Sequence, residues 1–270
     1  IFVSQETRGL ARRSHLFQLQ GTRAVKGFAA PEEIWRAIGH RRKIDRYFAF
    51  GRLNAALVNR LDEHRELMKS WQQAVQGLGQ ALLIEGEAGI GKSRLIHRTR
   101  AFMRGPNARR IMFQCHPSGP RTTLHPLLQA MPKPEGASGQ PISAAAVNRL
   151  FRQTGVYDRE AIDIFAYLLG AEGAGAGLKD ASLDVIREKS AWAARRCLEQ
   201  LCATGPLMLV VEDINWIDPT SLQLLSHALR AIESLPVLVI LTARPFPEDR
   251  RPDLPNTRIM PLRPLDRKDA

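Results

Sequence analysis

A glycine-rich stretch at residues 82–95, LLIEGEAGIGKSRL, limits what this chain can fold into more than any other feature. It begins with an apolar run typical of a buried β-strand and continues into residues 92–103, whose apolar positions recur with a helical period. Glycine destabilises the interior of a strand or helix, so Gly86, Gly89 and Gly91 need another explanation. They indicate a backbone that turns sharply and lets another molecule lie against it.

The spacing Gly86-x4-Gly91-Lys92-Ser93 fits the phosphate-loop pattern G-x-x-x-x-G-K-[ST]. Glycines let successive backbone N–H groups point at a triphosphate, and the N-terminus of the following helix adds partial positive charge. We expect the Lys92 ammonium to reach the β- and γ-phosphates and the Ser93 hydroxyl to bind Mg²⁺. The expected nucleotide contacts run through the loop: Gly86, Glu87, Ala88, Gly89, Ile90, Gly91, Lys92, Ser93 and Arg94.

A second apolar run, LMLVVED, ends in two acidic residues, Glu212 and Asp213. A phosphate loop works together with a carboxylate at the end of another buried strand, and this carboxylate holds Mg²⁺ through water. We expect one acid to serve the metal and the other to polarise the attacking water. We favour Asp213 for the metal and Glu212 for the base; the alternative is that one of them only caps the following turn.

A third apolar run, VLVILTA, is followed by Arg244. Ligands of open α/β sheets bind at the carboxyl ends of strands, so Thr242 and Arg244 are expected at the same edge as the phosphate loop. At that edge Arg244 would sense the γ-phosphate; the alternative is a surface arginine that precedes a proline loop. We interpret Trp216 as a packing residue and Asp218 as a helix cap. The candidate catalytic residues are therefore Lys92, Glu212 and Arg244.

Apolar runs that alternate with amphipathic segments predict an α/β fold of the P-loop NTPase class, with a parallel sheet covered by helices on both faces. Strands are expected at residues 81–86, 109–115, 207–211 and 237–243. Helices are expected at residues 59–77, 92–103, 143–153, 159–170, 182–204 and 218–232. Pro- and Gly-rich composition predicts loops at residues 131–141 and 171–177.

The chain carries 39 Lys and Arg against 27 Asp and Glu, a net charge of +12. A basic balance is compatible with nucleic-acid binding. The charge is spread along the sequence, however, and its one dense run, GHRRKIDR, resembles a linker. No zinc finger or aromatic RNA-binding motif is visible, so a solvated basic surface is favoured over a nucleic-acid partner.

Three cysteines, Cys115, Cys197 and Cys202, are too few and too irregularly spaced for a disulfide framework or a zinc site. We expect them to be reduced in the core of a cytoplasmic protein. No window approaches the ~18 uninterrupted apolar residues of a membrane span. The first residues also lack the basic and apolar regions of a signal peptide, so no membrane partner is expected.

Three stretches, LLIEGEAGIGKSRL, LMLVVEDINWIDPTSLQLL and LVILTARP, together resemble the signalling P-loop ATPases called STAND, in their AAA-type, origin-recognition-like branch. The resemblance covers residues 55–265 and implies an ATP- and Mg²⁺-dependent switch. That family carries VGRE before its first helix, with the arginine near the adenine. This chain has Val58-Asn59-Arg60-Leu61 there, so Arg60 is the implied adenine contact and Asn59 replaces the glycine.

The first 38 residues are similar to the C-terminal end of a class III nucleotide cyclase domain. That family's metal-binding aspartates are absent from this stretch, so the chain is not expected to cyclise ATP. The resemblance implies a longer parent protein, with a cyclase domain upstream and helical repeats downstream as packing partners. The expected organisation is a small α+β cyclase remnant at 1–38, a basic linker at 39–54, the ATPase domain at 55–265 and the start of another region at 266–270.

Three functions remain open on these grounds. The favoured one is a signalling switch that binds ATP and hydrolyses it slowly. The second is a scaffold in which a bound nucleotide is structural and is not hydrolysed. The third is a DNA-binding regulator, which only the net charge of +12 supports. The sequence does not determine the stimulus or the oligomeric state, and a homo-oligomer is one of the possible states.

Overall fold

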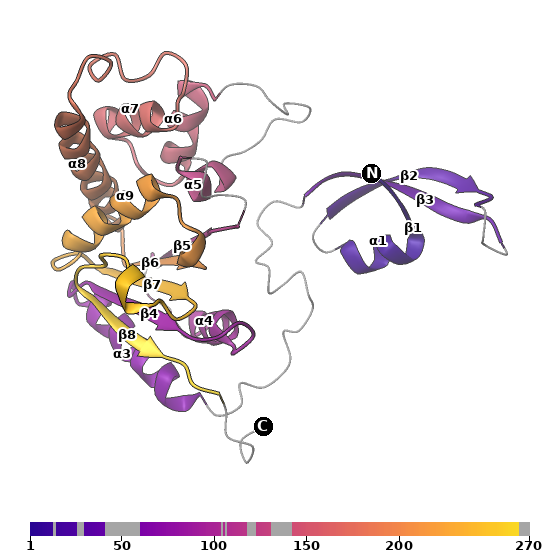
Figure 1. Ribbon diagram of the computed structural model, residues 1–270, viewed down its shortest axis with the longest axis horizontal. Coiled ribbons are helices and arrows are strands. Elements are labelled where there is room, and N and C mark those ends of the chain that lie inside the picture. Colours follow the sequence, from indigo (N-terminus) through magenta and orange to yellow (C-terminus); the bar gives the residue numbers. More distant parts are fainter. Residues whose placement is uncertain are drawn as a thin grey trace. The chain divides into compact units, whose positions relative to one another are not determined.

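The computed structural model describes residues 1–12, 15–25, 30–40, 60–103, 105, 107–117, 123–130 and 142–264. The chain divides into two compact units, Ile1–Val58 and Asn59–Ala270 (Figure 1). The expectations for most of the linker, for Asn59, for the loop at 131–141 and for residues 266–270 lie outside the described residues.

The first unit is a three-stranded antiparallel sheet with strand order β1-β3-β2. Its elements are β1 (Phe2–Ser4), α1 (Gln5–Ala11), β2 (His15–Arg23) and β3 (Glu32–His40). None of the described side chains in this unit is fully buried, so the described part of the unit has no closed hydrophobic core. The small α+β architecture matches the prediction, but β3 extends two residues into the stretch predicted as linker.

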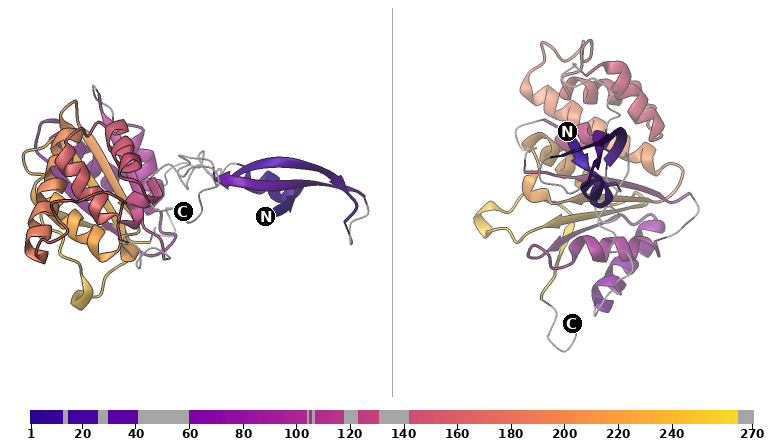
Figure 2. Two further views of the ribbon diagram at one scale, coloured as in Figure 1. Left: turned by 90° about the horizontal axis from the view of Figure 1, so that it is seen from above. Right: turned by 90° about the vertical axis from the view of Figure 1, so that its right-hand side faces the viewer.

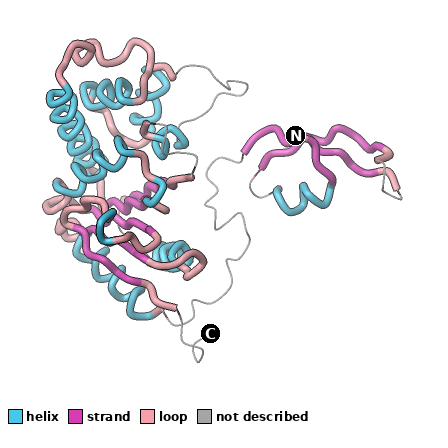
Figure 3. The backbone as a smooth tube through the Cα atoms, in the orientation of Figure 1, coloured by secondary structure: helices cyan, strands magenta, loops and turns pink. Residues whose placement is uncertain are grey.

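The local sequence pattern assigned no position to a helix in the first unit, whereas the structure has α1 there, as Figure 3 shows. The hydroxyl of Ser4 caps this helix by accepting a hydrogen bond from the backbone N of Thr7 at 3.3 Å. The guanidinium of Arg8 lies 3.8 Å from the centre of the Trp35 ring and holds the helix against the sheet. A seven-residue helix that contains a glycine shows too little periodicity for sequence reasoning to detect.

The second unit contains a parallel sheet in the order β5-β6-β7-β4-β8. Its strands are β4 (Gln80–Glu85), β5 (Arg109–Gln114), β6 (Leu207–Glu212), β7 (Val237–Ala243) and β8 (Thr257–Pro261). The strand β7 lies between β4, which leads into the phosphate loop, and β6, which ends in the acidic pair. This order brings the three strand ends that carry candidate site residues side by side.

Helices cover both faces of this sheet, as the alternation of apolar runs predicted (Figure 2). They are α3 (Leu61–Val75), α4 (Lys92–Arg100), α5 (His125–Ala130), α6 (Ala144–Gln153), α7 (Arg159–Leu168), α8 (Leu183–Cys202) and α9 (Pro219–Arg230), with short 3-10 turns η1 (Ile214–Trp216) and η2 (Glu248–Arg250). The predicted strands and helices all form, with ends that differ by a few residues.

Strand alternation divides the core into two layers. On one face Leu83, Val211 and Leu241 pack with residues of α8 and α9. On the other face Leu82 and Ile84 are fully buried, together with Leu67 and Trp71 of α3 and Leu95 and Ile96 of α4. A separate cluster joins α6, α7 and α8 in a helical layer beyond the sheet.

Two elements of this unit, α5 and β8, were not predicted from the sequence. In β8 only Met260 is buried, because the strand lies at the edge of the sheet, so no continuous apolar run marks it. In α5 the helix start is held by a side chain far away in the sequence. A contact of this kind cannot be recognised from the local sequence.

Candidate functional site

The phosphate loop joins β4 to α4, and its glycines are required by geometry. Gly89 has φ +80° and Gly91 has φ +107°, conformations that side-chain-bearing residues rarely adopt. A Cβ on Gly86 would lie 3.0 Å from both the Ile90 Cγ2 and the Leu262 carbonyl oxygen, which is too close for either to remain in place. The loop thus has the sharp bends that the sequence predicted, and at Gly86 the close approach is to the chain's own Ile90 and Leu262.

The first helical turn of α4 has no side-chain cap within the described structure, because its N-cap residue is Gly91. In the part of the chain that the structure describes, four helices of this unit begin with a side-chain cap, from Ser143, Asp158, Ser182 or Asp218, whereas α3, like α4, has none. An uncapped N-terminus presents backbone N–H groups and the positive end of the helix dipole. The phosphate loop therefore ends at a helix start suited to an anion.

Lys92 lies at the centre of the loop and is only 9% exposed. Its Nζ donates hydrogen bonds to the carbonyl oxygens of Gly86 at 2.6 Å and Glu87 at 3.0 Å, so the side chain curls back across the loop. Burial lowers the pKa of Lys92 below its usual range; the carboxylate of Asp213 partly restores it, and Arg244 lowers it further. A triphosphate at this position would favour the charged ammonium.

The acidic pair lies at the end of β6, as predicted. Glu212 is the last residue of the strand, is almost fully buried and shares the face of α3 and α4 with Met208 and Val210. Asp213 follows in a left-handed conformation with φ +58°. Its charge acts on Lys92, which places this carboxylate near the phosphate loop.

Thr242 and Arg244 lie at the end of β7, between the acids and the phosphate loop. The Thr242 hydroxyl, in a side chain 1% exposed, accepts a hydrogen bond from the backbone N of Asp213 at 2.9 Å. The backbone N of Arg244 donates to Oδ1 of Asn215 at 2.7 Å. Arg244 also acts electrostatically on Lys92, and β7 pairs with both β4 and β6, so this strand end lies at the same edge of the sheet as the phosphate loop.

Arg60 precedes α3 and is 7% exposed. Its guanidinium donates to Oε1 of Glu63 at 2.9 Å and to the carbonyl oxygen of Arg263 at 2.7 Å. Arg263 directly follows Leu262, whose N donates to the carbonyl of Glu85 at 2.7 Å and whose oxygen borders Gly86. Arg60 therefore lies at the edge of the phosphate loop that β8 borders.

Sequence reasoning missed two side chains that shape this edge, Glu85 and Asn215. The Glu85 carboxylate, directly before the loop, forms an ion pair with Arg251 at 3.0 Å. The Asn215 carboxamide contacts Arg244. Both partners are distant in sequence, so the only local signal was a polar residue next to a motif.

Asp218 has a larger structural role than the single cap predicted for it. Its carboxylate, 1% exposed, accepts hydrogen bonds from the N of Ser221 at 2.9 Å and the Ser221 hydroxyl at 2.6 Å, which caps α9. It also accepts from the backbone N of Leu124 and of His125, each at 3.1 Å, and so caps the start of α5. One carboxylate thus joins two helices.

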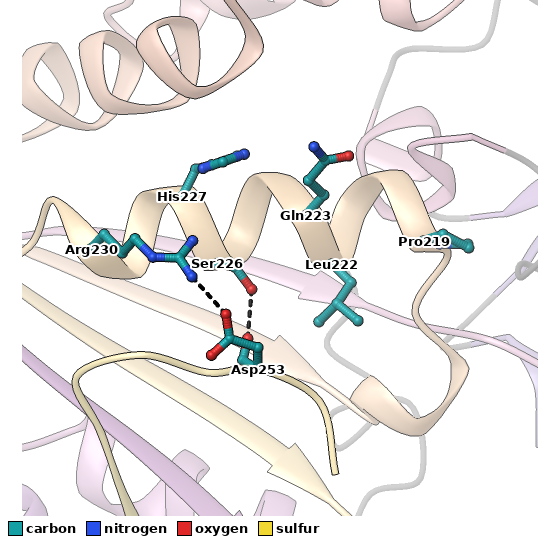
Figure 4. A pocket seen from close by; sticks show the side chains of 7 residues that line it. All are labelled: Pro219, Leu222, Gln223, Ser226, His227, Arg230 and Asp253. Atoms are coloured by element: carbon teal, nitrogen blue, oxygen red, sulfur yellow. Dashed lines mark hydrogen bonds and ion pairs between the residues drawn. The ribbon is translucent and has the colours of Figure 1, made fainter. Parts of the chain in front are cut away.

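A groove lies between α9 and the segment that contains Asp253 (Figure 4). Arg230 forms an ion pair with Asp253 at 2.6 Å, and the Ser226 hydroxyl donates to the Asp253 carbonyl at 2.5 Å. The groove is lined by Pro219, Leu222, Gln223, Ser226, His227, Arg230 and Asp253. None of them is a predicted nucleotide contact, so we place the functional site at the strand ends.

A family model described as an AAA ATPase domain matches residues 56–240, more than half of the chain. The chain belongs to the AAA ATPase domain family. The match includes the phosphate loop and the acidic pair, and it ends inside β7, before Arg244. The AAA ATPase domain is thus a P-loop ATPase domain by fold, motifs and family.

The chain is 45% identical over 268 residues to an uncharacterized protein of Rhizobium meliloti (strain 1021), covering 98% of this chain and 26% of that protein. The chain therefore spans about a quarter of this relative's length. A structure of Drosophila ORC bound to DNA matches 73% of this chain and 41% of that chain, at 13% identity and a TM-score of 0.36. The cytoplasmic domain of the Thermomonospora curvata type VII secretion ATPase EccC matches 63% and 16%, at 19% identity and a TM-score of 0.26.

Among the described residues, no helix is both long and apolar enough to pass through a membrane. The described residues also contain no group of three or more His, Cys, Asp or Glu side chains suited to a metal. Mg²⁺ in nucleotide sites needs no such cage, because one or two protein ligands act together with phosphates and water.

The thiols of the AAA ATPase domain should be unreactive in the folded protein. Cys115, Cys197 and Cys202 are free and buried, and burial raises each pKa to about 12. At pH 8 the thiolate fraction is therefore very small. We expect a thiol-disulfide reagent to modify none of the cysteines within minutes in native protein and all three after unfolding. Rapid labelling of a native thiol would contradict the buried placement.

Proposed function

We propose that the domain is an ATP-driven switch that binds ATP with Mg²⁺ and hydrolyses it slowly. The observation that carries the proposal is that Lys92, Asp213 and Arg244 follow three neighbouring strands, β4, β6 and β7, at one edge of the sheet. The charges of Asp213 and Arg244 also act on the pKa of Lys92. A buried cation, an acid and a second cation at an uncapped helix start match the charge pattern of a nucleotide phosphate site.

The residues present fit a triphosphate and its metal ion. Lys92 would bind the β- and γ-phosphates, and the backbone of the loop would contact the remaining phosphate oxygens. The Ser93 hydroxyl and the Asp213 carboxylate would hold Mg²⁺, which when bound supplies positive charge to the phosphate oxygens. Arg60, at the edge of the loop that β8 borders, would contact the adenine of the nucleotide.

The hydrolytic step would depend mainly on positioning. The Glu212 carboxylate, which is almost fully buried, would accept a proton from a water molecule. Arg244 would bind the γ-phosphate and lose this contact after hydrolysis. The loss of the phosphate charge that faces Arg244 would then alter how the segment after β7 packs.

We further propose that the domain works as a STAND-type signalling switch in the cytoplasm. The support is the sequence resemblance and the length of the relative, of which this chain covers 26%. The first unit, a small antiparallel sheet with one helix, is proposed to be the end of a cyclase-like domain. Its neighbours in such a protein would be the partners that respond to the nucleotide.

Replacing each acid by its amide should separate the two proposed roles. We expect Glu212→Gln to lower ATP turnover by about a hundredfold or more, since a general base contributes that much, while ATP stays bound. We expect Asp213→Asn to bind nucleotide with little dependence on Mg²⁺. The measurement is phosphate release across a Mg²⁺ titration, together with the ATP-to-ADP ratio retained after desalting.

The matched control is Glu188→Gln, on the exposed face of α8, which should match the wild type in both measurements. If Asp213→Asn abolishes turnover and Glu212→Gln removes the Mg²⁺ response, the two acids have exchanged roles. If wild type binds ATP but releases no phosphate, and Glu212→Gln changes nothing, the domain is a non-hydrolysing scaffold.

A further inference from the structure

Asn215 contacts the residue that we propose as the phosphate sensor. Its Oδ1 accepts from the backbone N of Arg244 at 2.7 Å, and its Nδ2 donates to the carbonyl oxygen of the same residue at 3.3 Å. A backbone N–H only donates and a carbonyl only accepts, so this pairing determines which way the carboxamide is turned. A side chain needs an acceptor and a donor side by side to make both bonds.

A second connection runs between the same two turns in the opposite direction. The Thr242 hydroxyl accepts from the backbone N of Asp213 at 2.9 Å. Asp213 has φ +58°, an uncommon conformation for a residue with a side chain, and this hydrogen bond helps to hold it. The turn after β6 therefore contacts the backbone after β7 through Asn215, and β7 contacts the turn through Thr242.

These connections link the backbones of Asp213 and Arg244, whose charges both act on Lys92. Asp213 and Arg244 both act on the ammonium from this edge of the sheet. Arginine has a long, flexible side chain, and a hydrogen bond to its guanidinium is useful only when the backbone directs it to one place. Nothing in the acidic motif itself supplies that constraint, whereas Asn215 does.

We propose that Asn215 is a positioning residue for recognition of the γ-phosphate: it holds the Arg244 backbone so that the guanidinium faces the phosphate bound by Lys92. The inference rests on the proposed ATP-binding function and adds to it. Asn215 touches neither the nucleotide nor the attacking water in this scheme. Its contribution passes through Arg244, and this distinguishes the proposal from a general effect on stability.

The test measures how strongly the protein prefers ATPγS to ADP. The measured quantity is the dissociation constant of ADP divided by that of ATPγS, both with Mg²⁺ present. We expect Asn215→Ala to reduce this ratio about tenfold, with ADP affinity nearly unchanged. Arg244→Ala should reduce it at least as much. The double variant should match Arg244→Ala, because Asn215 has nothing left to position. Asn148→Ala, on α6, is the control and should match the wild type.

Hydrogen–deuterium exchange of nucleotide-free protein gives a second readout. The Arg244 amide should exchange about tenfold faster in Asn215→Ala, because its acceptor is removed. Asn215→Asp keeps that acceptor and loses the donor. The exchange rate of its Arg244 amide should therefore lie between the rates of the wild type and of Asn215→Ala.

The outcomes separate the inference from the function beneath it. If wild type fails to bind ATPγS, the proposed function is wrong and the inference fails with it. If wild type discriminates and Asn215→Ala discriminates equally well, only the role of Asn215 is overturned. A further loss in the double variant beyond Arg244→Ala would also overturn that role, because Asn215 would then act independently of Arg244.

Discussion

Lys92→Ala is expected to weaken nucleotide binding by about a hundredfold or more, which corresponds to about 3 kcal/mol. The substitution removes the one buried ammonium of the loop and leaves the carbonyl oxygens of Gly86 and Glu87 without their described donor. A triphosphate would then meet these two carbonyl oxygens with no cation to offset them. Titration of a fluorescent ATP analogue, with and without Mg²⁺, measures the effect.

The control is Lys69→Ala, which removes the same charge from the exposed face of α3. It should bind nucleotide as the wild type does. Thermal unfolding of both variants without nucleotide shows whether the loop still folds. If Lys92→Ala retains full affinity while remaining folded, the phosphate site has been assigned to the wrong residues.

Asp218→Ala is expected to lower the free energy of unfolding of the second unit by about 3–5 kcal/mol. The substitution removes the acceptor for three backbone N–H groups and one hydroxyl, at a position that is 1% exposed. Buried donors that lose their partners cost far more than a surface cap does. Urea unfolding followed by circular dichroism measures the change.

Asp180→Ala removes an exposed carboxylate and should change the free energy of unfolding by less than about 0.5 kcal/mol. A change of only about 1 kcal/mol in Asp218→Ala would show that Asp218 acts as an ordinary helix cap. In that case the contact with α5 would add little to stability.

Local patterns were sufficient to predict most of the ATPase fold. The strands β4, β6 and β7 are continuous apolar runs, because both of their faces are buried. The phosphate loop could be predicted because its chemistry needs neighbouring residues in one order. The positions of these residues in the fold were predicted as well: Gly86 directly follows β4, and Glu212 is the last residue of β6.

The elements that were missed depend on partners distant in the chain. The start of α5 is capped by Asp218, 94 residues after Leu124, and no pattern around Leu124 announces this. The edge strand β8 is too exposed to form an apolar run. In the first unit, α1 is short and partly exposed, so its helical period is weak.

The sequence by itself determined that a phosphate loop follows a buried strand, that two acids end another and that an arginine follows a third. Only the tertiary structure decided that β7 lies between β4 and β6, which brings Arg244 to the same edge of the sheet as Lys92 and Asp213 and lets Asn215 hold its backbone. The physical reason is the distance along the chain between the residues that interact. A motif is read from residues joined by the chain, whereas strand order follows from how whole buried faces pack, and that packing selects which distant residues meet.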